Sequence, residues 1–133
     1  MTDEELKNTI AGMLKDDRAG ASAFHDAVRK LRAIATALEA SLAPDVIDVR
    51  VEAGHRVNLG QQYSLVVCVP KAGLRDVLLR AYVPTEGFPV TLDLFDDEHP
   101  KCASLDELEA TILHFLSHAD VKQRLLEVKD VAA

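Results

Sequence analysis

The spacing of apolar residues changes twice along the chain. Before residue 44 apolar residues recur every three to four positions, and from residue 46 they alternate with polar ones. The first spacing is typical of amphipathic helices and the second of half-buried strands. A helical spacing returns after residue 104. The pattern therefore predicts helices at both ends of the chain and a block of strands between them.

Two helices are predicted before the first change. The first begins at a capping box formed by Thr2 and Glu5, and Gly20 predicts its exit. The second covers about 22–42 and ends before Pro44, which disfavours helical geometry in the residue before it. At about 1.5 Å per residue this helix is roughly 30 Å long, so we expect it to brace a whole sheet. The first helix carries the apolar residues Leu6, Ile10, Met13 and Leu14.

Four strands are predicted, at 46–52, 63–69, 77–83 and 90–94. The connections after the second and third strands are too short for crossover helices, so neighbouring strands should be antiparallel. The link 54–62 is longer and fits either an extended hairpin or a loop.

Two further helices follow the strands. Ser104 and Glu107 form a second capping box before a helix at 105–117, and Asp120 begins a final helix. The order ααββββαα predicts the α+β class: a four-stranded antiparallel meander with two N-terminal and two C-terminal helices packed mainly on one face.

Composition narrows this picture to one acidic domain spanning residues 1–133. The net charge is −7, and residues 85–133 hold 11 acidic and 4 basic side chains. An anionic surface repels phosphate groups, so we expect neither a nucleic-acid nor a membrane partner. The chain begins with acidic residues and has no long apolar run, which predicts a cytoplasmic protein.

The spacing of His99, Cys102, His114 and His118 approaches that of a zinc finger. On a helix whose buried stripe includes Leu108, however, both His114 and His118 point to solvent. We therefore predict no metal site and no cofactor.

The two cysteines differ in context, and we expect no disulfide between them. Cys68 lies in the most apolar strand, whereas Cys102 stands near a helix N-terminus beside Lys101 and is predicted to be the more reactive thiol. The chain has neither a nucleophile elbow nor a phosphate-binding glycine loop. The sequence therefore does not indicate an enzyme, although a catalytic site built from distant residues would escape such a search.

The face of the sheet turned away from the helices is the leading candidate site. If the final helix does not cover it, its mixed aromatic, apolar and charged side chains suit a protein partner. We therefore expect a non-catalytic interaction module (adaptor, chaperone-like or inhibitor protein) that binds through this face or an edge strand, with a homodimer as one form. The residues expected there are Arg50, Leu78, Arg80, Tyr82, Asp93 and Phe95.

The alternative is a small-ligand binder or an enzyme with a pocket between the sheet and the long second helix. The link 54–62 would then supply polar groups to the ligand. An ordinary exposed hairpin is the competing interpretation of the same link. The residues expected to bind the ligand are His55, Arg56, Asn58 and Gln61.

Overall fold

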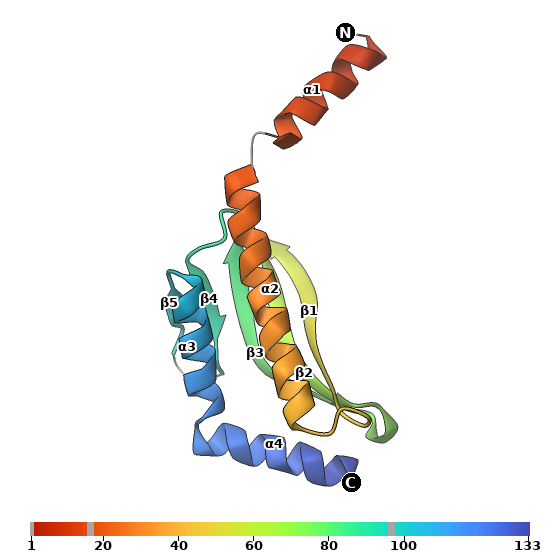
Figure 1. Ribbon diagram of the computed structural model, residues 1–133, viewed down its shortest axis with the longest axis vertical. Helices are drawn as coiled ribbons and strands as arrows, with labels where there is room; N and C mark the ends of the chain where they lie inside the picture. The colour runs from red at the N-terminus through yellow and green to blue at the C-terminus, as the bar shows by residue number, and fades with distance from the viewer. Residues whose placement is uncertain (1, 16–17, 96–97) are drawn as a thin grey trace.

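A single antiparallel sheet with strand order β1-β2-β3-β4-β5 forms the centre of the fold. The computed structural model describes residues 2–15, 18–95 and 98–133 (Figure 1). The α+β class and the meander are confirmed, but the sheet has a fifth, two-residue strand that is too short to show an alternating pattern. The strands are β1 (Asp48–Val57), β2 (Gly60–Val69), β3 (Leu74–Pro84), β4 (Val90–Asp93) and β5 (Lys101–Cys102).

The helices flank the strands in the chain, as predicted. They are α1 (Asp3–Lys15), α2 (Arg18–Ser41), α3 (Leu105–Leu116) and α4 (Ala119–Ala132). The predicted exit at Gly20 is wrong, because Gly20 lies inside α2. One glycine costs a helix only about 1 kcal/mol, which a long and well-packed helix can absorb. Asp16 and Asp17, also assigned to that exit, lie outside the described residues.

Helix α2 lies across the sheet, and α3 and α4 pack on the same side (Figure 1). The buried residues of all three helices join one cluster with one face of the sheet. The α4 members of this cluster are Val121, Leu125 and Val128. Arg124 also donates to Asp76 at the start of β3, at 2.7 Å. The final helix therefore belongs to the helical side and does not cover the opposite face.

Helix α1 is the exception to this packing. It extends beyond the end of the sheet (Figure 1), and its apolar side chains are exposed, with Leu14 at 77%. The predicted cap is present, since the Glu5 amide donates to the Thr2 hydroxyl at 3.2 Å. The cap of α3 is present as well, with the Glu107 amide donating to the Ser104 hydroxyl at 3.2 Å.

The link 54–62 is an extended hairpin rather than a loop. Strands β1 and β2 continue pairing up to Val57 and Gly60, so only two residues form the turn. One of them, Asn58, has a φ of 52°, a left-handed conformation that asparagine tolerates well.

Candidate functional site

The face of the sheet opposite the helices, called the reverse face below, is defined by the strand register. Arg80 pairs with Asp93, and Tyr82 pairs with Thr91, so these four side chains share one face. Arg50 reaches the same face through its pairing with Val66. Within the described parts of the chain, no helix contributes a residue to a cluster on this side.

Leu78 does not belong to the reverse face, contrary to the sequence prediction. Leu65 pairs with Leu79, but the next residue of β2, Val66, pairs with Val77. Leu78 is the extra residue of this β-bulge, and its side chain turns to the helical side. It is 0% exposed and belongs to the core.

Exposed charges on the reverse face are paired along the sheet. Arg50 donates to Asp48 at 3.0 Å, and this hydrogen bond raises the pKa of the Arg50 guanidinium above its usual value. Arg75 contacts both carboxylate oxygens of Glu52, the closer at 2.7 Å. Such exposed pairs are worth only about 0–1 kcal/mol each, so a binding partner could replace them at little cost.

Arg80, Tyr82 and Phe95 form a different kind of group. The guanidinium of Arg80 lies over the Phe95 ring, 5.3 Å from its centroid, in a cation–π contact. Among the described residues Arg80 has no carboxylate partner. The Tyr82 hydroxyl donates to the Val57 carbonyl at 3.1 Å, which fixes its ring over Gly60. Arginine and aromatic side chains are enriched where proteins contact proteins.

A pocket of about 520 Å³ lies between the first turns of α2 and the β1–β2 hairpin. It is an open pocket rather than an enclosed cavity. Of the four residues expected to bind a ligand, Arg56 and Gln61 line it, whereas His55 and Asn58 do not. The full lining is Phe24, His25, Arg56, Gly60, Gln61, Tyr63 and Thr85.

An irregularity in β1 explains why Arg56 lines the pocket. Ala53 pairs with Tyr63 and faces α2, and uninterrupted alternation would then turn His55 toward α2 and Arg56 away. Instead Arg56 pairs with Gln61, so three steps in β1 match two in β2. This extra residue places Arg56 beside Gln61 on the helical side.

Two segments hold the rim of the pocket. The Thr85 amide donates to the Leu59 carbonyl at 2.7 Å, which joins the end of β3 to the hairpin turn. The Gln61 side-chain amide donates to the Gly54 carbonyl. The Gln61 side-chain carbonyl oxygen accepts no hydrogen bond from a described residue.

Tyr63 forms part of the inner wall of the pocket and is 8% exposed. Burial raises the pKa of its phenol above 10.0, while the charges of Arg32 and Arg56 act in the opposite direction. The Phe24 ring lies 6.3 Å from the Tyr63 ring, so aromatic and cationic groups meet in one place.

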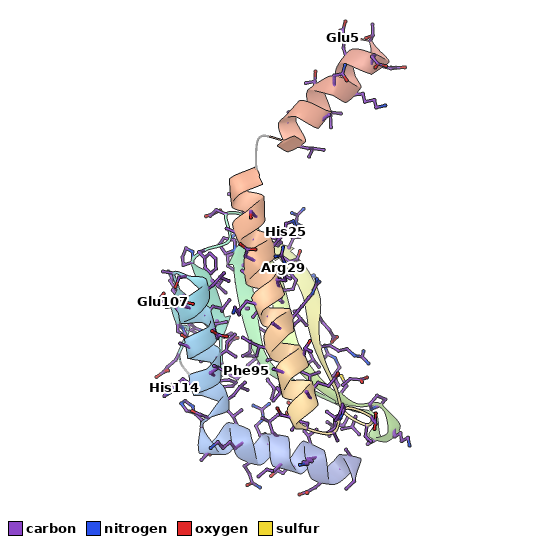
Figure 2. The ribbon with its side chains drawn as sticks, viewed as in Figure 1. Glu5, His25, Arg29, Phe95, Glu107 and His114 are labelled. Atoms are coloured by element: carbon purple, nitrogen blue, oxygen red, sulfur yellow. The ribbon has the colours of Figure 1, made fainter. Side chains whose placement is uncertain are left out.

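The sequence did not single out Phe24, His25 or Tyr63 as ligand-binding residues. Phe24 and His25 are neighbours in α2 (Figure 2 labels His25). Tyr63 places a hydroxyl at a strand position whose neighbours on the same face, Leu65 and Val67, are apolar. Which strand residues meet this part of α2 depends on tertiary packing.

A second hollow, of about 280 Å³, lies between α2 and α3. Its lining is almost entirely apolar, apart from an ion pair of 3.5 Å between Lys30 and Glu109. It offers few groups that could orient a polar ligand.

The histidines of the zinc-like spacing do not gather around a common point. His114 and His118 are exposed, as predicted, and their rings stack edge to face with centroids 4.9 Å apart (Figure 2 labels His114). His99 instead lies 3.9 Å from Asp93. In the described parts of the chain no three His, Cys, Asp or Glu side chains are placed to hold a metal ion.

The prediction that Cys102 is the more reactive of the two thiols is wrong. Cys102 is 1% exposed, and burial raises its pKa above 9.0. Its position near the N-terminus of α3 does not outweigh this burial, because its side chain points into the core. Cys68 is also buried and free.

No described helix is both long and apolar enough to span a lipid bilayer. Comparison with protein-family models, curated proteins and solved structures found no match to the chain.

Proposed function

We propose that the chain is a non-catalytic protein-interaction module whose partner binds the reverse face of the sheet. The observation that carries this proposal is the group of Arg80, Tyr82 and Phe95 on a sheet face over which no described helix packs. Antiparallel sheets often leave one face in water, but arginine and aromatic side chains together on such a face are typical of a protein-binding surface. Two free buried thiols, Cys68 and Cys102, agree with a reducing compartment such as the cytoplasm.

The chemistry of this group defines the partner. Arg80 forms no ion pair with a described carboxylate, and it lies next to the half-exposed ring of Phe95. A partner segment with a carboxylate beside an apolar side chain would satisfy both groups. Strand β1 forms one edge of the same sheet, so a partner strand could extend the surface there.

Site-specific photo-crosslinking tests this proposal. A photoreactive residue at Thr91, on the reverse face, should give a discrete adduct in the producing cells, whereas one at Ala110 on α3 should not. The partner identified in this way is then purified. Its affinity should fall at least about tenfold for the Arg80→Ala/Tyr82→Ala variant, because aromatic and arginine anchors dominate such interfaces.

The matched control is Arg29→Ala. Arg29 is an exposed arginine on α2 that pairs with Asp26 and lies on the other side of the molecule. An equal loss of affinity in both variants, or none in either, would remove the reverse face as the binding site. Sedimentation of the purified chain shows whether the partner is a second copy.

A second candidate function is the binding of a small ligand. The observation that favours it is the open pocket of about 520 Å³ between α2 and the hairpin, a volume within the usual range for ligand sites. A thermal-shift screen of metabolites tests it, because a ligand that binds the folded chain raises its melting temperature. A raised melting temperature that an Arg56→Gln substitution abolishes would support this function, and one that persists would place the ligand elsewhere.

A further inference from the structure

We infer that the pocket between α2 and the β1–β2 hairpin binds a small organic anion that carries an aromatic or similarly flat apolar group. Arg56 would hold the negative group beside the Tyr63 hydroxyl, and the apolar part would lie against Phe24. This inference rests on the second function proposed above and specifies its class of ligand.

The charge of the pocket is the first argument. The chain carries 22 acidic and 15 basic residues, yet the lining contains Arg56 and His25 and no carboxylate. An acidic protein thus has a locally basic pocket. Such a pocket attracts anions by its own field, and low-dielectric walls strengthen the attraction.

The unpaired arginine of the lining is the second argument. In the part of the chain that the structure describes, Arg56 has neither a side-chain hydrogen bond nor an ion pair. Several other arginines each contact a carboxylate: Arg29, Arg50, Arg75 and Arg124. A guanidinium group without a carboxylate, in the same lining as Tyr63, leaves a place for an external anion.

The Tyr63 hydroxyl is the third argument. It makes no hydrogen bond to a described residue, and because no described side-chain polar atom is both buried and without a partner, solvent reaches this hydroxyl. Tyr63 lines the pocket, so an anion held by Arg56 would accept this hydrogen bond in place of water.

The aromatic wall defines the rest of the ligand. Phe24 is half-buried, and its ring lies 6.3 Å from the Tyr63 ring. Ring faces at this spacing suit a flat apolar group better than a hydrated ion. Because the pocket is open, part of the ligand stays in water, and we expect dissociation constants from about 10 μM to 1 mM.

A carboxylate and a phosphate share the chemistry that this site recognises, so the test includes both. The ¹⁵N-labelled full chain is titrated with benzoate, phenyl phosphate, inorganic phosphate and the neutral analogue benzamide. Benzoate or phenyl phosphate should shift the amide signals of Arg56, Gln61, Tyr63 and Thr85. Benzamide should bind about tenfold more weakly, since it cannot form charge-assisted hydrogen bonds.

Three variants locate the binding groups. Arg56→Gln should weaken binding about fivefold to thirtyfold, and Tyr63→Phe about threefold, through the loss of donors to the anion. Arg29→Gln, on α2, should change it less than about twofold. Circular dichroism verifies that each variant is folded, and both arginine changes lie at exposed positions.

The tighter of benzoate and phenyl phosphate identifies the anion. Inorganic phosphate that binds as tightly as phenyl phosphate would overturn the aromatic part of the inference. Benzamide that binds as tightly as benzoate would show that the ligand need not be an anion. The proposed function of ligand binding would still be supported. If no probe shifts these signals at about 10 mM, the inference fails, and the metabolite screen then decides separately whether the pocket binds any ligand.

Discussion

Tyr63 and Cys102 are weak acids that the fold holds in their neutral forms. Burial raises the pKa of each above its ordinary value, 10.0 for the phenol and 9.0 for the thiol. A group whose pKa is raised in the folded state contributes stability fully below its unfolded value. That contribution is lost as the pH rises through the folded value. The folded chain should therefore lose stability above about pH 9.

This alkaline loss can be measured with Cys102→Ala. At pH 7.5 the variant should be less stable than the wild type by about 1–2 kcal/mol, because a buried side chain is shortened. At pH 10 the difference should shrink, since the variant has no thiol to ionise. Urea unfolding at both pH values gives the free energies. Parallel losses in the two proteins would contradict the role given to the thiol, and Tyr63→Phe provides an independent check through the phenol.

Gly60 lies so close to neighbouring atoms that there is no room for a side chain. A Cβ atom there would come within 2.7 Å of the Tyr82 ring and of the Val83 carbonyl oxygen. We expect Gly60→Ala to lower the free energy of unfolding by about 1–3 kcal/mol, the usual cost of overpacking. Gly12→Ala is the control: nothing lies within 4 Å of the added carbon, so the substitution should be neutral or slightly stabilising. Thermal unfolding compares the two variants. Equal changes in melting temperature would show that the Tyr82 ring moves aside without loss of stability.

At the scale of the elements, α1 and α3 both have an N-cap, but only α3 packs on the core. Both begin with a side-chain hydroxyl that accepts an amide hydrogen bond, from Thr2 in α1 and from Ser104 in α3. The buried residues of α3 belong to the core, whereas the apolar residues of α1 are exposed. Only the cap of α3 is therefore coupled to cooperative unfolding.

We therefore expect removal of the N-cap hydroxyl to lower the free energy of unfolding in α3 but not in α1. Ser104→Ala should lower the free energy of unfolding by about 1 kcal/mol, the typical value of an N-cap. Thr2→Ala should leave that value unchanged and reduce only the helical signal of α1. Chemical denaturation followed by circular dichroism measures both. A loss of global stability in Thr2→Ala would mean that α1 packs on the core.

The elements themselves could largely be predicted from the sequence, because their patterns are local. The alternation in 46–52 and the caps at Thr2 and Ser104 each identify an element through neighbouring residues. The fifth strand could not be found, since two residues carry no periodicity. The two bulges were also missed: the side on which Leu78 or Arg56 lies depends on the register with another strand, which no local pattern contains.

At the scale of the whole molecule, stability comes from one cluster that joins the sheet with α2, α3 and α4. None of the described side chains of helix α1 belongs to this cluster. An isolated helix of 13 residues is marginal in water, so α1 should fold and unfold independently of the rest.

Removal of residues 1–17 tests this independence. The shortened chain should keep its free energy of unfolding within about 0.5 kcal/mol, as expected for changes away from the core. Hydrogen exchange of the full chain should show α1 amides exchanging far faster than those of β2. A destabilisation of several kcal/mol on removal would show that α1 contributes to the core.

The candidate sites were less predictable than the fold, for reasons of scale. The reverse face follows from alternation within strands, so Arg80 and Tyr82 could be placed on it from the sequence alone. The pocket combines α2, the hairpin and the end of β3, and only the packed molecule brings Phe24, Tyr63 and Thr85 together. Its position near 54–62 was predictable because polar residues concentrate in that hairpin.

Between the pairs Ala53–Tyr63 and Arg56–Gln61, β1 has one more residue than β2, and this bulge has an evolutionary consequence. One residue inserted between Gln61 and Tyr63 would bring the two strands back into step, turning the imidazole of His55 toward α2 and the Arg56 guanidinium away from it. An imidazole would then replace a guanidinium on the side of the hairpin that faces α2. A single added codon could thus exchange the basic group of the pocket without altering any existing side chain.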